Sequence, residues 1–147
     1  MTRYEVSFSL PWVHGWQRAG TNYETRTHFT QERTRNDEDE VGIGYRNASN
    51  RAYGRVVRAP KGVPVHVKID LYKTEPQRRP DYLPDYVDGV PFVVKPDIDN
   101  NKHLLDGLNK VAWYDDAQVV TEFVRKHDRE GVTDDRTDVT VVFELEE

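Results

Sequence analysis

The chain has 147 residues, of which 36% are hydrophobic and 32% are charged, which gives enough apolar material for one modest core in a single domain over 1–147. It contains no cysteine, and this excludes disulfides, zinc–thiolate sites, iron–sulfur clusters and cysteine nucleophiles. The net charge of −5 counts against a typical nucleic-acid binder, because contacts between basic side chains and phosphates supply most non-specific affinity.

The beginning of the chain predicts a strand followed by a loop. Residues 3–10 alternate polar and apolar side chains up to Pro11, and residues 11–30 show no clear period. The first residues lack the apolar stretch of a signal peptide, and no apolar run approaches the roughly 20 residues of a membrane helix. We therefore expect a soluble protein of the cytoplasm, or of the host cytoplasm if a phage encodes it.

The next segment is polar and difficult to assign. Residues 31–52 carry an acidic run, and a helix is plausible over 45–58. Gly42, Gly44 and Gly54 weaken that pattern, because glycine lowers helix propensity.

The strongest strand pattern follows. Residues 64–73 place valine, isoleucine and leucine side chains on one face and polar side chains on the other. Residues 74–91 contain four prolines and predict a long connection, of the kind that is often functional. Residues 92–95 are predicted to be extended.

The last third of the chain predicts one helix and two strands. Residues 101–112 have apolar side chains at helical spacing, and residues 117–126 and 136–146 read as strands. The hydrophilic residues 127–135 are expected to join these strands as a hairpin. Together the elements predict a small α+β domain, with a mixed sheet of about four strands and one or two helices packed on one face.

Four carboxylates flank the predicted helix. Asp97 and Asp99 are two residues apart in a segment predicted to be extended, so their side chains should project from the same face. Asp115 and Asp116 follow the helix and precede a strand that could return alongside. If it does, three or four carboxylates meet in one pocket, which suits magnesium, since this ion prefers oxygen ligands.

Simpler readings of these aspartates exist. Asp99 or Asn100 could cap the helix, and an Asp-Asp pair after a helix could form a turn. Capping does not need four carboxylates, which repel one another unless a cation is bound. A calcium loop that starts at Asp97 fails, because its required glycine and glutamate positions hold Lys102 and Leu108.

The motif around these carboxylates resembles that of the RusA family of Holliday-junction resolvases. The similarity covers about 30 residues, 95–126, and its ordered combination is specific. The residues that carry it are Lys95-Pro96-Asp97-Ile98-Asp99-Asn100-Asn101-Lys102, Leu105-Asp106-Gly107-Leu108-Asn109, Trp113-Tyr114-Asp115-Asp116-Ala117-Gln118-Val119 and Arg125-Lys126.

The resemblance implies a RusA-like homodimer that binds four-way DNA junctions and makes paired, magnesium-dependent nicks, with manganese as a possible substitute. It also implies that Asp97, Asp99 and Asp116 are catalytic carboxylates that bind the metal. Adjacent residues usually diverge, so of Asp115 and Asp116 we expect one to bind metal and the other to support it.

The lysine of the motif departs from the family pattern. The family has it four residues after the second aspartate, whereas Lys102 follows Asp99 by three and His103 occupies the fourth position. On a helix these two side chains point about 100° apart, so only one can face the site. We favour Lys102 as the catalytic lysine, because Asp106 follows it at i+4 on the same face.

Several basic side chains are candidates for DNA contacts. Lys126 matches a family position and Arg125 precedes it, while Arg78 and Arg79 lie in the proline-rich connection. An ordinary solvated surface explains such charges equally well. Further candidates for phosphate contacts, for which a solvated surface is again the alternative, are Arg55, Arg58 and Lys61.

Three functions follow from these observations. The first is a magnesium-dependent endonuclease that resolves four-way junctions. The second is a non-catalytic protein that binds branched DNA on the same scaffold, which the acidic charge and the displaced lysine favour. The third is an acidic domain with no role on DNA.

Overall fold

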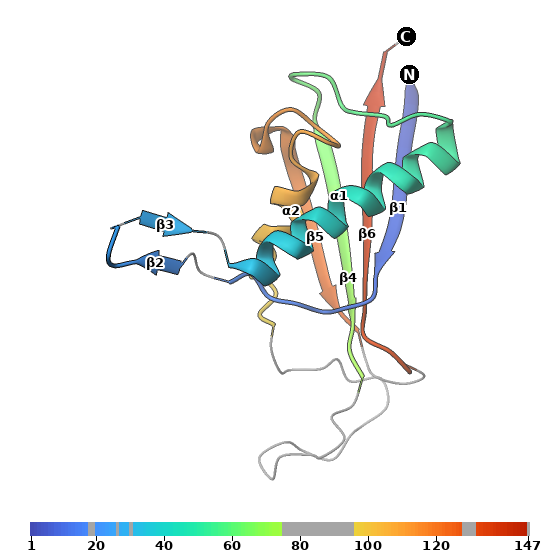
Figure 1. Cartoon of the computed structure of the whole chain (residues 1–147). Coiled ribbons are helices and arrows are strands. Elements are labelled where there is room, and N and C mark those ends of the chain that lie inside the picture. Colours follow the sequence, from blue (N-terminus) through green and yellow to red (C-terminus); the bar gives the residue numbers. More distant parts are fainter. Residues whose placement is uncertain (18–19, 26, 30, 75–95, 128–131, 147) are drawn as a thin grey trace.

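The computed structural model describes residues 1–17, 20–25, 27–29, 31–74, 96–127 and 132–146 (Figure 1). Six strands and two α-helices lie in these residues, together with the short 3-10 helix η1. In chain order they are β1 Thr2–Leu10, β2 Gly20–Asn22, β3 Thr27–Phe29, α1 Glu32–Tyr53, β4 Val65–Tyr72, α2 Lys102–Leu108, η1 Asp116–Gln118, β5 Val119–Lys126 and β6 Arg136–Leu145.

Four of the strands form one mixed sheet in the order β1-β6-β4-β5. The β1–β6 and β6–β4 pairs are antiparallel, whereas β4 and β5 are parallel. Both α-helices lie on one face of this sheet (Figure 1). The predicted α+β architecture is therefore confirmed.

The core lies between the sheet and the helices. Buried and exposed residues alternate along β1, β4 and β6, as the sequence pattern of the corresponding segments predicted. Trp113, Tyr45 and Phe143 are the largest fully buried side chains. Neither helix in the described residues has both the length and the apolar character needed to cross a membrane.

The predicted hairpin over 127–135 is wrong. β5 and β6 do not pair; β4 lies between them, and β5 runs parallel to β4 with Asp70 opposite Arg125. A parallel pair needs a long crossover connection, and the segment that contains α2 lies within it. Periodicity marks a strand but does not reveal its neighbour, which is why the pairing was missed.

The prediction for the N-terminal half needs two corrections. The expected loop over 11–30 contains the short antiparallel pair β2–β3. The helix expected over 45–58 is α1, which begins at Glu32 and ends where Gly54 adopts a left-handed conformation with φ 71°. Gly44 lies so close to β1 that an added Cβ would be 2.7 Å from the Phe8 ring, so this glycine lets the helix pack on the sheet.

Helix α2 is shorter than predicted. It begins after Asn101, not after Asp99 or Asn100, and no side chain caps it. It ends at Leu108, and a turn follows in which the N–H groups of Val111 and Ala112 both donate to the Leu108 carbonyl. Ala112 is still buried, so the apolar spacing that suggested a longer helix is satisfied by this turn.

Candidate active site

The two aspartates before α2 lie in a turn and not in an extended segment. The Asn100 N–H donates to the Asp97 carbonyl oxygen at 3.0 Å, and Asp97, Ile98 and Asp99 are all exposed. The expectation that Asp97 and Asp99 share a strand face is therefore wrong, because alternation applies only to extended backbone. The proline that precedes Asp97 fixes the start of this turn and is itself buried.

The N-terminal segment holds this turn in place. The Trp16 N–H donates to the Asn100 carbonyl at 3.1 Å. Gly15 packs against the same residue so closely that a Cβ there would lie 2.4 Å from the Asn100 amide nitrogen. The loop after β1 therefore braces the aspartate turn, a contact between segments far apart in the sequence.

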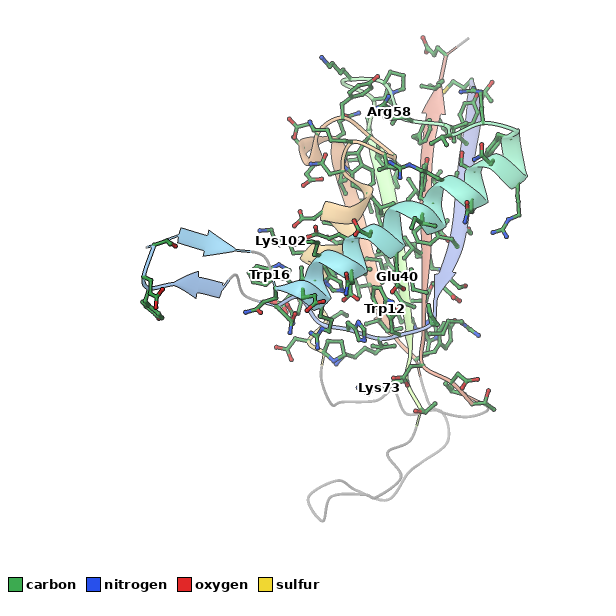
Figure 2. The ribbon with its side chains drawn as sticks, viewed as in Figure 1. Trp12, Trp16, Glu40, Arg58, Lys73 and Lys102 are labelled. Atoms are coloured by element: carbon green, nitrogen blue, oxygen red, sulfur yellow. The ribbon has the colours of Figure 1, made fainter. Side chains whose placement is uncertain are left out.

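The first turn of α2 presents Lys102 outward and His103 inward. Lys102 is exposed, with its Nζ 5.1 Å from the centre of the Trp16 ring, and Figure 2 shows the two labelled side chains close together. His103 is fully buried, with its ring 5.8 Å from the Trp12 ring. Of the two candidates for the motif lysine's position, only Lys102 can face solvent and substrate.

Burial keeps His103 neutral. Desolvation, then the nearby charges of His14 and Arg33, lowers the pKa of His103 to about 4, and the His14 backbone opposes this shift. Neither ring nitrogen of His103 makes a hydrogen bond of normal geometry with the described residues. An uncharged imidazole is thus buried beside Trp12, in the first turn of the helix that follows the aspartate turn.

A group of charges links α1, α2 and η1. Burial raises the pKa of Asp106; Lys102 opposes this shift and the negative charge of Asp116 adds to it. Burial also raises the pKa of Glu38, with repulsion from Asp106 next and attraction to Lys102 acting against it. We call Glu38, Lys102, Asp106 and Asp116 the acidic cluster, because Lys102 attracts both Glu38 and Asp106, and Asp106 is repelled by Asp116.

Glu38 was not predicted as part of the site. It joins the acidic cluster because α1 and α2 pack closely: a Cβ on Gly107 would lie 2.8 Å from the Glu38 carbonyl oxygen. The only sequence signal was the acidic run in residues 36–40, and assigning it required knowledge of this helix contact.

The two aspartates after α2 have different roles. Asp115 caps η1: its side chain accepts from the Ala117 N–H at 2.9 Å, and Gln118 completes a capping box. Asp116 is exposed, and its Oδ1 accepts from Nε1 of the buried Trp113 at 2.9 Å. The indole fixes one oxygen of Asp116 and leaves the carboxylate facing solvent.

A second buried network lies next to His103. The Trp12 Nε1 donates to Glu40 at 2.7 Å, a pair that Figure 2 labels, and the Trp12 ring stacks on His14. Both Asp37 carboxylate oxygens lie 3.0 Å from His14 Nδ1. Burial raises the pKa of Asp37 and His14 lowers it. Trp12 is thus a packing residue of this network and not a free surface for stacking bases.

A family comparison bears directly on this arrangement. The model of the family described as endodeoxyribonuclease RusA matches residues 12–142 of the 147. The chain belongs to the RusA family of endodeoxyribonucleases. The search of curated proteins found no match.

The aspartates of this RusA-family chain are chemically suited to a divalent metal. Asp97, Asp99 and Asp116 offer exposed carboxylate oxygens, the donors that magnesium prefers. In the part of the chain that the structure describes, no three acidic, histidine or cysteine side chains are grouped closely enough to hold one ion. Among these residues, Asp97, Asp99 and Asp116 are therefore not brought together as one ligand set, and an ion held by all three would have to draw the carboxylates closer.

Of the basic residues expected to contact DNA in this RusA-family protein, the structure describes Arg125 and Lys126, at the end of β5. Arg125 is opposite Asp70 and Lys126 is opposite Leu71, so the two side chains point to opposite faces of the sheet, Lys126 on the side of the helices. Arg78 and Arg79 lie outside the described residues, as does Lys95, which opens the motif.

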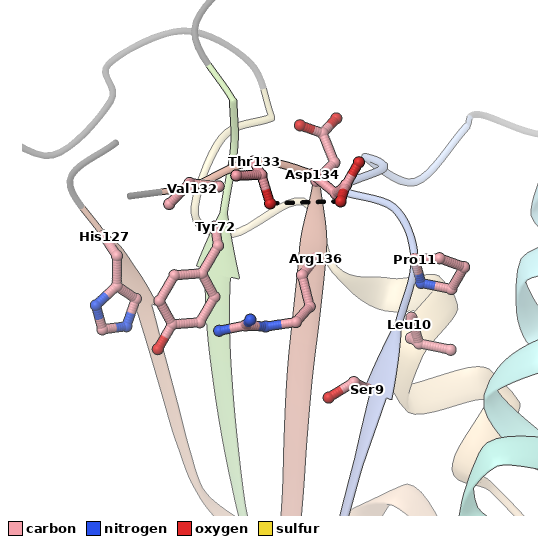
Figure 3. A pocket seen from close by; sticks show the side chains of 10 residues that line it. Ser9, Leu10, Pro11, Tyr72, His127, Val132, Thr133, Asp134 and Arg136 are labelled. Carbon is pink, nitrogen blue, oxygen red and sulfur yellow. Dashed lines mark hydrogen bonds between the residues drawn. The ribbon is translucent and has the colours of Figure 1, made fainter. Parts of the chain in front are cut away.

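A different polar group occupies the helix-free face of the sheet. His127 Nε2 lies 2.7 Å from Asp70, its ring stacks on Tyr72 at 4.3 Å, and the Arg136 guanidinium lies 4.3 Å from the Tyr72 ring centre. Tyr72, His127 and Arg136 are among the residues that line a hollow of about 640 Å³ at the end of the sheet (Figure 3). Asp97, Asp99, Lys102 and Asp116 do not line this hollow.

Proposed function

We propose that this protein is a structure-selective, magnesium-dependent endonuclease that resolves four-way DNA junctions by paired phosphodiester hydrolysis. One observation carries the proposal: in a chain of an endodeoxyribonuclease family, the charges of the motif residues Lys102 and Asp116 both act on Asp106, which brings α2 and η1 into one electrostatic group. Mutual repulsion between carboxylates is relieved when a cation or a phosphate-bound cation sits beside them.

In this proposal Asp97, Asp99 and Asp116 hold the metal. Asp115 is the weaker candidate, because capping η1 already uses one of its oxygens. Bound magnesium, or manganese in its place, would lower the pKa of a water molecule and neutralise charge on the phosphate being cut. Trp113 would set the orientation of Asp116 through the indole hydrogen bond.

Lys102 is proposed to contact the scissile phosphate. Its ammonium is exposed, lies beside the Trp16 ring, and is attracted by Asp106 and Glu38. These neighbours restrict the side chain without burying it. A lysine held in this way can stabilise the negative charge that grows on the phosphate oxygens.

A homodimer is part of the proposal, because a symmetric junction needs two active sites to be cut in both arms. Strand β5 lies at the edge of the sheet and exposes Val120 and Phe123, which are 60% and 54% accessible. An edge strand with exposed apolar side chains is a surface suited to association. Lys126 and Arg125, and Arg78 and Arg79 of the proline-rich connection, are proposed to contact the DNA arms.

A cleavage assay tests the proposed function. Purified protein is incubated with a synthetic four-way junction, with no metal, with Mg²⁺ or with Mn²⁺, and linear duplex of the same sequence serves as control. We expect paired nicks in the junction only when a metal is present. Binding without nicks under every condition would favour the non-catalytic branched-DNA binding protein, and equal binding to linear duplex would contradict both.

A further inference from the structure

Three exposed cations lie around Tyr114, next to the proposed site. The Arg58 guanidinium lies 4.4 Å from the centre of the Tyr114 ring, and Lys61 Nζ lies 5.7 Å from it. Lys110 Nζ donates a hydrogen bond to the Tyr114 carbonyl. We call Arg58, Lys61 and Lys110 the basic patch; Arg58 is labelled in Figure 2, on the loop that runs from α1 to β4.

The basic patch is built on a rigid support. The Gln118 side chain donates to the Pro60 and Val63 carbonyls and accepts from the N–H groups of Tyr114 and Asp115. This one buried amide therefore joins the segment that carries Arg58 and Lys61 to the segment that carries Lys110 and Asp116. Binding to a site already ordered in the folded protein loses less conformational entropy.

The backbone at Lys110 is itself unusual. Its φ is 69°, and it is the one non-glycine residue among those described with a positive φ. Such a conformation costs a non-glycine residue roughly 1 kcal/mol or more. Lys110 is nevertheless tied at both ends, because its Nζ reaches Tyr114 and its carbonyl accepts from Arg58 at 2.9 Å. Because the fold maintains this strained backbone at Lys110, we infer that the position of its ammonium group has a function.

Within the described residues, no acidic partner neutralises the charge of the basic patch. None of the ion pairs within the described residues involves Arg58, Lys61 or Lys110. In a chain of net charge −5, three neighbouring cations are a local exception. Lys61 and Lys110 border a hollow of about 740 Å³, whose one acidic lining residue among those described, Asp115, already uses its Oδ1 as the η1 cap. Mutual repulsion of the cations would be relieved by a polyanion.

We propose that the basic patch binds the phosphodiester backbone of a duplex DNA arm that leaves the acidic cluster. This proposal rests on the proposed function, because it places the arm next to Asp116. Tyr114 directly precedes Asp115 and Asp116, and successive phosphates of a strand are separated by only about 3.4 Å along the helix axis. A phosphate at Asp116 would therefore bring others of the same strand to the patch.

Phosphate is favoured over a stacked base as the occupant. Arg58 already covers the Tyr114 ring at 4.4 Å, so an unpaired base would have to displace the guanidinium in order to stack. The exposed ends of the three cations remain available for phosphate oxygens.

The salt dependence of junction binding tests this proposal. Fluorescence anisotropy of a labelled four-way junction is measured against NaCl concentration with a chelator present, so that binding is read without cleavage. Each lost phosphate contact reduces the slope of log affinity against log salt by about 0.9. We expect Lys61→Gln/Lys110→Asn to reduce the slope by about 1.8 relative to the unmodified protein, and asparagine at 110 tolerates the positive φ.

The control variant is Arg3→Gln/Arg51→Gln, which removes the same charge from β1 and the last turn of α1 and should keep the original slope. The single variant Lys61→Gln breaks no hydrogen bond of the described structure. It replaces the double variant if that protein does not fold, and we expect it to reduce the salt slope by about 0.9. If the unmodified protein binds the junction and the Lys61 variants keep its salt slope, the proposed role of the basic patch is wrong but the proposed function is not. No junction binding by the unmodified protein would overturn the proposed function as well.

Discussion

The two ends of α2 carry the same residue type but differ in how firmly it is held. Before the helix, Asp97 and Asp99 lie in an exposed turn, braced through backbone bonds at Asn100. After the helix, Asp116 accepts from the buried Trp113 and its neighbour Asp115 caps η1. One end therefore has carboxylates that can adjust to a ligand, whereas the other has a carboxylate whose position is fixed by the fold.

This difference suggests how an acidic protein, with a net charge of −5, can handle a negatively charged substrate. In the proposed site, the fixed carboxylate of Asp116 would provide a reference position, and the carboxylates on the exposed turn would close around a cation and a phosphate when both arrive. Preorganised groups act without rearrangement at the moment of reaction, while exposed ones can respond to binding.

The largest expected effect is a difference in cleavage rate between variants of the two adjacent aspartates at the fixed end, Asp116 and Asp115. Asp116→Asn is expected to lower the rate of junction cleavage by about 10³-fold, because several kcal/mol of metal-dependent stabilisation is lost. Asp115→Asn should keep most activity, since asparagine also caps. Single-turnover cleavage rates measure this difference, and thermal unfolding shows whether both variants are folded. Equal loss of activity in the two variants would contradict the assignment of a metal-binding role to Asp116 and a capping role to Asp115.

The next effect concerns the buried histidine at the adjustable end. The pKa of His103 in the folded protein, about 4, lies below its ordinary value of 6.5, so below pH 6.5 the unfolded chain takes up a proton that the folded chain does not. Stability from this group is present above pH 6.5 and is lost as the pH falls towards 4, by roughly 3 kcal/mol in total.

His103→Leu removes that proton uptake. Burial raises the pKa values of Asp37, Glu38 and Asp106, which act in the opposite direction in both proteins, so the comparison must be between variant and unmodified protein. We expect the free energy of unfolding in urea to fall less steeply between pH 6.5 and 4 in the variant. Parallel curves for the two proteins would show that the imidazole is not held neutral.

A smaller effect is expected at Lys102, which lies between the two ends. Lys102→Gln should lower the cleavage rate by about 10²-fold with little change in junction affinity, because one charged contact to the transition state is lost. Lys102→Arg should restore part of the rate. Cleavage rates and affinities are measured separately, and a loss confined to affinity would make Lys102 a binding residue only.

The sequence was sufficient for the overall architecture and for the identity of the motif. Alternation predicted β1, β4 and β6, since each of these strands has one buried face. It could not place β5 beside β4, because a strand pattern carries no information about its neighbour.

The rest of the site depended on contacts between distant segments. Of the glycines that seemed to weaken a helix, Gly42 lies at the contact of α1 with α2 and Gly44 at the contact of α1 with β1. The packing of α1 on α2 brings Glu38 near Asp106. The spacing of Asp97 and Asp99 suggested a shared strand face, whereas proline and the following residues form a turn. The roles of Asp115 and Asp116 became distinct only once Trp113 was located.

The central claim is that the carboxylates at both ends of α2 serve one metal-dependent cleavage step. Its most direct test is junction cleavage by Asp97→Asn and Asp99→Asn, with binding measured in parallel. The account predicts that either variant loses magnesium-dependent nicking while junction binding survives or becomes stronger, because a repelling charge is removed beside the phosphates. Retained nicking in magnesium by either variant would contradict it.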